Sequence, residues 1–164
     1  MNAVIALTLC LSFATGAAAA NYVKDLKSKD DAKVVAAAEA LAGRGMAVGL
    51  SREELEALTK VAMDAKPAVA AAAADALAAN HDVALSAEYA EKYEKETIYF
   101  AAFLLWYSIY NTYAGLAEIE GDEIGGGVFD EMNRAAERAE KAYGNILDSE
   151  RKTLAESYYR NLRL

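Results

Sequence analysis

Apolar residues recur at three- and four-residue steps through most of this chain, which is the spacing of one face of an α-helix. The alternation of apolar and polar residues that a half-buried strand requires does not occur between turn signals. Alanine, leucine, glutamate and lysine fill the long stretches, and these residues lose little conformational freedom in a helix. The pattern therefore predicts an all-α fold.

Capping residues divide the first half of the chain into short helices. Asp30 or Asp31 is expected to cap a helix that ends near Ala42. Gly43 and Gly45 follow, and glycine readily adopts the left-handed conformation that terminates helices. One short helix is therefore expected here.

The clearest helix start lies at Ser51. Ser51 and Glu54 have the spacing of a capping box. Leu50 and Leu55 flank the box and can pack on each other as a hydrophobic staple. This helix must stop before Lys66, because Pro67 disfavours the α conformation just ahead of it. Pro67 then starts another helix at its first position.

The helix expected over 67–79 is rich in alanine, so it is thin, can approach a neighbour closely and should be buried. Residues 80–82 mark a break after it. Ser86 is then expected to cap the longest helical stretch, which runs to about Ile119 and changes from charged to uncharged near Thr97.

Two amphipathic helices are expected to complete the chain. One runs from about Val128 to Tyr143, with Gly144 as terminator, and the other spans 149–162, with Asp148 or Ser149 as cap. Each helix is expected to turn one apolar face towards the protein core. In the first helix this face consists of Phe129, Met132, Ala136, Ala139 and Tyr143, and in the second it consists of Leu154, Tyr158 and Leu162.

The segment from Ile98 to Ala117 has no charged side chain and is rich in aromatic residues. We expect it to be the central helix of a bundle, surrounded by other helices, because its tyrosine hydroxyls and polar side chains would be unfavourable in the hydrocarbon core of a membrane. Two alternatives are open: a transmembrane helix over 98–117, and an aromatic-lined groove for a ligand or partner. The groove would be formed by Tyr99, Phe103, Trp106, Tyr107 and Tyr110.

The N-terminal segment resembles a secretory signal peptide. Val4 to Phe13 is an apolar run, and small residues at Ala18 and Ala20 fit the cleavage rule, so the mature chain would begin at Asn21. No lysine or arginine precedes the run, which leaves an upstream start codon as an alternative. We therefore expect an exported protein, periplasmic or secreted, with 1–20 as signal peptide and 21–164 as a single all-helical domain. Within that domain, helical hairpins occupy 21–80, and a long helix with two C-terminal helices occupies 86–164.

Charge and composition argue against several functions. The net charge is −8, which repels nucleic-acid backbones, so no nucleic-acid partner is expected. The one cysteine, Cys10, lies in the leader, so the mature chain has no disulfide. His81 is the only histidine and is better explained as a solvent-exposed residue at a helix break than as a catalytic base. We predict no enzyme activity, cofactor or metal site.

An acidic loop and a glycine-rich turn follow the uncharged segment. The carboxylates of the acidic loop could bind a calcium ion, but the EF-hand spacing is missing. A solvated loop is the preferred interpretation. These carboxylates are Glu118, Glu120, Asp122 and Glu123. The glycines at 125–127 lack the following Lys-Ser/Thr of a phosphate loop, so they predict a turn.

Residues 22–78 contain an internal similarity. When Leu41 is aligned with Leu77, each half consists of a helix, a polar break and an alanine-rich second helix. This arrangement resembles HEAT-like helical repeats, and the resemblance implies stacked hairpins that bind other proteins. The remainder is similar to small exported bacterial helical proteins of unknown function. We expect a protein-interaction or structural module, with a membrane-associated protein as the alternative.

Overall fold

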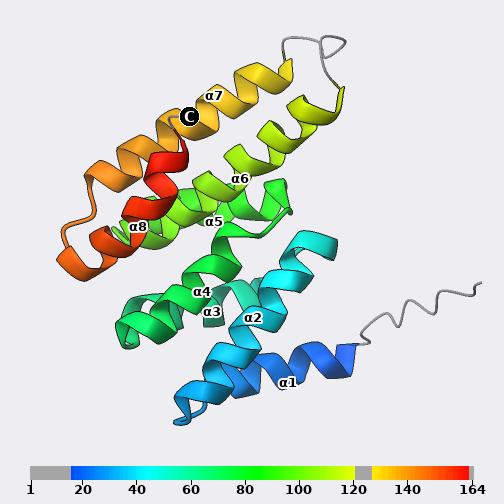
Figure 1. The fold of residues 1–164 in the computed structure, drawn as a ribbon, viewed down its shortest axis with the longest axis vertical. Coiled ribbons are helices and arrows are strands. Elements are labelled where there is room, and N and C mark those ends of the chain that lie inside the picture. The colour runs from blue at the N-terminus through cyan, green and yellow to red at the C-terminus, as the bar shows by residue number, and fades with distance from the viewer. Residues whose placement is uncertain (1–15, 121–126, 163–164) are drawn as a thin grey trace, which may run out of the picture.

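The computed structural model describes residues 16–120 and 127–162, and these residues form helices without any strand, which confirms the all-α prediction. Figure 1 shows their arrangement. The helices are α1 (Gly16–Leu26), α2 (Asp31–Val48), α3 (Arg52–Asp64), α4 (Pro67–Ala78), α5 (Val83–Lys95), α6 (Tyr99–Glu120), α7 (Gly127–Gly144) and α8 (Ser149–Asn161).

Consecutive helices pack as hairpins: α1 with α2, α3 with α4, and α5 with α6 (Figure 1). The second helices of the hairpins contact one another in order, α2 with α4 and α4 with α6. Helix α7 lies along α6, and α8 contacts α4, α6 and α7. A single cluster of buried hydrophobic residues therefore runs through the described helices. Descent of the hairpins from HEAT-like repeats stays a prediction.

Several predicted helix starts are confirmed. The Asp30 carboxylate accepts a hydrogen bond from the Ala32 N–H at 3.0 Å and caps α2. The capping box at the start of α3 is present in full, because the Ser51 N–H donates to the Glu54 carboxylate at 2.8 Å and the reciprocal bond also forms. Pro67 occupies the first turn of α4. Local sequence chemistry thus decides these starts.

The predicted end of α2 near Ala42 is wrong, because the helix continues to Val48. Gly45 lies buried inside it, and a Cβ there would come within 3.3 Å of the Ala79 carbonyl oxygen. Its lack of a side chain thus permits close approach to the turn after α4. The helix ends instead at Gly49, which has a φ of 81°.

The predicted helix from Ser86 to Ile119 is two helices. Asp82 caps α5 by accepting from the Leu85 N–H at 2.9 Å, whereas Ser86 is buried within α5. The chain turns at Thr97, which has a φ of 61°. The turn lets α6 fold back on α5 and bury an apolar face that one continuous helix would expose.

The uncharged segment is buried over its first half only. Every residue from Phe100 to Ile109 is buried, whereas the residues from Tyr110 to Ala117 are half-buried, except Leu116, which is 39% exposed. Ser86, near the start of α5, lies beside Ser108, and Asn161, at the end of α8, donates to the Tyr107 hydroxyl at 3.3 Å. Helices α5 and α8 therefore both end near the middle of α6, whereas α7 continues along it (Figure 1). Among the described helices, none combines the length and apolar character needed to cross a bilayer.

The predicted inward faces of α7 and α8 are partly wrong. Helix α7 buries Ala135, Ala139 and Ala142, whereas Phe129 is 44% exposed and Met132 is half-buried. Alanines allow α7 to approach α6 closely, so the larger apolar residues lie at the flank of the contact. In α8 the buried residues are Arg151, Ala155 and the cap Leu162, while Leu154 and Tyr158 are half-buried.

Candidate functional site

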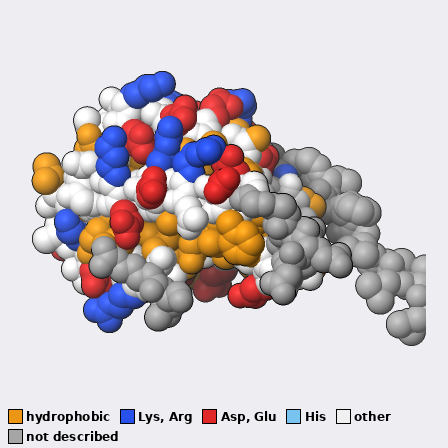
Figure 2. Space-filling view, turned by 90° about the horizontal axis from the view of Figure 1, so that it is seen from above, with side chains coloured by type: hydrophobic (Ala, Val, Ile, Leu, Met, Phe, Trp, Pro, Cys, Tyr) orange, Lys and Arg blue, Asp and Glu red, His pale blue; other side chains and the backbone are white. Residues whose placement is uncertain are grey.

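A strip of apolar side chains lies on the part of α6 and α7 that α8 does not cover. Figure 2, which looks down on the α7 side of the molecule, shows hydrophobic side chains gathered in a band bordered by charged ones. We call this surface the α6–α7 band. Helical spacing from Tyr107 and Tyr143 assigns to it Tyr110 and Ala114 on α6 and Phe129, Met132 and Ala136 on α7, all of which are at least partly exposed.

Helical spacing places the α7 residues of the band on the side that faces α8. Tyr143 stacks on Tyr159 of α8 with ring centroids 4.0 Å apart. Ala136, Met132 and Phe129 precede Tyr143 at steps that return to the same face of a helix. This face is therefore covered by α8 near Tyr143, whereas no described helix covers it towards Phe129, which is 44% exposed.

On α6, ring contacts place the band on the same side. The Tyr110 ring lies 6.4 Å from the Tyr107 ring, which in turn makes an edge contact with Tyr158 of α8 at 5.4 Å. The band therefore continues the groove in which α8 lies.

The charges at the Phe129 end of the band are mostly acidic, and Arg134 is the first basic residue along α7. Every charged residue between Leu116 and Asn133 in the sequence is Asp or Glu. Of those described, Glu118 and Asp130 are exposed, and Glu131 pairs with Arg134 at 2.7 Å. An apolar surface beside such a rim favours a ligand that carries apolar groups and positive charge.

The aromatic residues of the predicted groove lie in different places. Phe103 is buried, with its ring 5.6 Å from that of Tyr143. Trp106 donates to Glu94 at 2.8 Å and lies under the Arg138 guanidinium. Tyr107 borders α8, Tyr110 belongs to the band, and Tyr99 lines two hollows at the other end of α6. The described hollows thus do not unite these five side chains.

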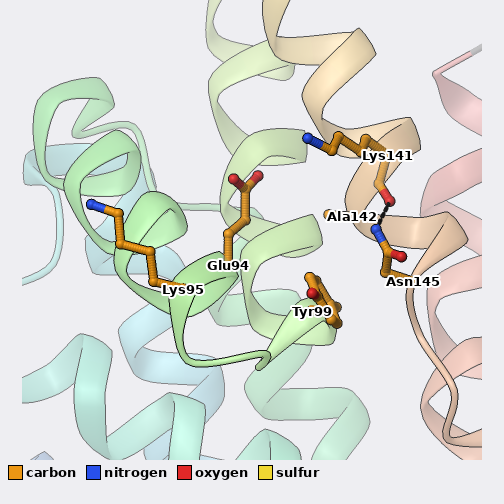
Figure 3. Close-up of a pocket in the computed structure, with 6 residues that line it drawn as sticks. All are labelled: Glu94, Lys95, Tyr99, Lys141, Ala142 and Asn145. Carbon is orange, nitrogen blue, oxygen red and sulfur yellow. Dashed lines mark hydrogen bonds between the residues drawn. The ribbon is translucent and has the colours of Figure 1, made fainter.

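One of the hollows beside Tyr99 is polar and has a volume of about 230 Å³ (Figure 3). Glu94 and Lys95 line it from α5, and Lys141 and Asn145 line it from the end of α7. The Asn145 side-chain amide donates to the Lys141 carbonyl at 2.9 Å, as the dashed line in Figure 3 shows. Figure 3 also shows the Lys95 amine pointing away from the other residues. Side chains of both charges, Glu94 and Lys141, therefore line this hollow.

The second hollow beside Tyr99 has a volume of about 200 Å³ and contains a buried guanidinium. We call it the Arg151 hollow. Its lining includes Met63, Tyr99, Phe100, Leu147, Asp148 and Arg151. Arg151 was not expected at a site, because an arginine in the first turn of an amphipathic helix normally lies in solvent.

His81 and the acidic loop provide no described metal centre. His81 is exposed in the turn between α4 and α5 and borders a hollow that also contains Tyr158. Burial, together with a hydrogen bond to Asp75, raises the pKa of the Tyr158 phenol far above its usual value, so this group stays protonated. The described residues hold no cluster of metal-binding side chains, and residues 121–126, which include Asp122 and Glu123, lie outside them.

No family model matches the chain, and no curated protein or solved structure is significantly similar to it. A function for these surfaces must therefore be argued from their own chemistry. The α6–α7 band and the Arg151 hollow are the two features whose chemistry indicates a class of ligand.

Proposed function

We propose that this protein is an exported, non-enzymatic interaction module that docks a basic amphipathic helix of a partner protein on the α6–α7 band. The observation that carries the proposal is the partly exposed apolar band, with Phe129 at 44% exposure, beside an acidic rim. An apolar stripe of this kind is the usual receptor for one face of an amphipathic helix.

Helix α8 shows how a helix fits this face. It lays Tyr158 against Tyr107 and Tyr159 against Tyr143, and it ends where Asn161 meets the Tyr107 hydroxyl. A partner helix on the band would extend the same groove beyond that end. Apolar residues at three- and four-residue steps would contact Phe129, and the opposite face would stay in water.

Charge supports a basic partner over a second copy of this chain. Glu118 and Asp130 at the rim, with a net charge of −8 for the whole chain, repel an identical molecule. Lysine and arginine at the edges of a docked helix would instead meet carboxylates. These rim contacts would raise the association rate and weaken as salt is added.

Replacement of Phe129 by serine tests the proposal, with a synthetic amphipathic helix of leucine and lysine as the probe. We expect the substitution to weaken binding about fivefold, because burying the exposed part of a Phe side chain contributes about 1 kcal/mol. The measurement is fluorescence anisotropy of the labelled peptide at low and at high salt.

The matched control is Leu147→Ser, which removes an apolar side chain that is 94% exposed and belongs to the Arg151 hollow. This variant should bind the leucine–lysine peptide like the parent protein. A leucine–glutamate peptide of the same length should not bind. Equal affinity for the two peptides, or an unchanged affinity in Phe129→Ser, would refute docking on the band.

Export is supported by the apolar, uncharged leader with small residues at Ala18 and Ala20. Most of the leader lies outside the described residues, but α1 begins at Gly16, so cleavage after Ala20 would shorten this helix. We expect the intact mass of the protein from the exported fraction of expressing cells to correspond to a chain that begins at Asn21. Recovery of only uncleaved chain from the cell interior would contradict export.

A further inference from the structure

The Arg151 hollow contains an unusual arrangement of hydrogen-bond donors. Arg151 is only 5% exposed, and its Nη2 donates to the Met63 and Ala65 carbonyls at 2.9 and 2.7 Å. These bonds satisfy carbonyls at the end of α3. Its Nε and Nη1 are also buried, and neither has a hydrogen-bond partner among the described residues. Two buried donors of a charged group without acceptors are costly, so an acceptor is expected here.

Neighbouring carboxylates compensate this charge only in part. The Glu150 carboxylate is 4.0 Å from Nη1, beyond hydrogen-bond distance, and its side chain lies mostly in solvent. The Asp148 carboxylate is already used as the cap of α8, where it accepts from the Arg151 backbone N–H at 2.8 Å. Neither residue supplies an acceptor to the two free donors.

The start of α6 adds positive potential to the same hollow. Tyr99 and Phe100, the first two residues of α6, both line it. The Ala102 N–H donates to the Ile98 carbonyl at 3.1 Å, which places Ile98 at the N-cap position. An isoleucine side chain has no acceptor for the first N–H groups of the helix, so the positive end of the helix dipole is left without a side-chain cap.

The rest of the lining combines hydrocarbon with the polar side chains of Thr97, Asn145 and Asp148. Met63, Phe100 and Leu147 contribute hydrocarbon surface, and Leu147, at 94% exposure, stands at the solvent boundary. A volume of about 200 Å³ suits a small molecule with a few carbon atoms. The Arg151 cation beside hydrocarbon matches one anionic group beside an alkyl group. Because the Asp148 carboxylate in the lining already offsets part of the positive charge, a phosphate dianion would bring excess negative charge and no apolar part.

We propose that the Arg151 hollow binds a small monocarboxylate with a short alkyl chain. Its carboxylate accepts hydrogen bonds from the Arg151 guanidinium and lies near the start of α6, and its alkyl group packs on Met63, Phe100 and Leu147. This site lies apart from the α6–α7 band, so either proposal can fail without the other.

The test is calorimetric titration of the purified full-length chain with isovalerate, and with inorganic phosphate for comparison. We expect millimolar binding of isovalerate and weaker binding of phosphate. In a nuclear magnetic resonance titration, the Arg151 Nε–H resonance should shift with isovalerate, because a carboxylate that accepts from the guanidinium changes its environment directly. Absence of binding, tighter binding of phosphate, or shifts confined to another surface would overturn the proposal.

Three substitutions sharpen the test, two at exposed residues and one at Arg151 itself. Leu147→Glu places a negative charge at the boundary of the hollow and should weaken isovalerate binding about fivefold to tenfold through repulsion. Val48→Glu makes the same change at another exposed apolar residue, outside the lining of the hollow, and should leave binding unchanged. Arg151→Met should abolish binding, and its folding is checked by circular dichroism because Arg151 also bonds the end of α3. Equal effects of the two glutamate substitutions would contradict the assigned site.

Discussion

Replacement of Phe103 by alanine is expected to lower the free energy of unfolding by about 4 kcal/mol. The Phe103 side chain is fully buried in the first half of α6, with its ring beside those of Tyr107 and Tyr143. Alanine would remove most of this apolar surface and leave a cavity that the surrounding helices can close only partly. Urea denaturation followed by far-ultraviolet circular dichroism measures the change.

The control for Phe103→Ala is Ile119→Ala on the same helix. Ile119 is 83% exposed, so its replacement should change the free energy of unfolding by less than about 0.5 kcal/mol. The pair separates burial from helix propensity, because both substitutions introduce alanine into α6. Similar small effects for both variants would mean that Phe103 is not enclosed by the helices of its own chain.

Replacement of Asn80 by alanine is expected to cost about 3 kcal/mol of unfolding free energy. Asn80 is fully buried, and its side-chain oxygen accepts from the Leu50 N–H at 2.9 Å while its amide donates to the Ser86 hydroxyl at 2.9 Å. The side chain thus links the turn before α3 to α5. Alanine would leave the Leu50 N–H and the Ser86 hydroxyl short of partners in a buried place.

The comparison variant for Asn80→Ala is Asn145→Ala. Asn145 is exposed, and its amide donates to the Lys141 carbonyl, so water can replace the lost bond. We expect a change below about 1 kcal/mol in denaturant titration. If Asn145→Ala were as damaging as Asn80→Ala, the buried network around Asn80 would not be the source of the effect.

The sequence predicted the candidate sites only in part. The sequence identified the aromatic character of α6, but Phe103 proved to be core and Trp106 lies under Arg138. Phe129 was expected in the core, yet it is part of the α6–α7 band, because the alanines beside it form the contact with α6. Arg151 gave no signal in the sequence, since its burial depends on the end of α3, far away along the chain.

The sequence by itself determined the helical class and those boundaries that depend on near neighbours. The Ser51–Glu54 capping box and Pro67 act within a few residues, so their effect can be read directly. Only the tertiary structure decided the role of Gly45, the turn at Thr97 and the exposure of the second half of α6. These features depend on which distant helices pack against each segment and on where those helices end. The local spacing of apolar residues contains no information about either.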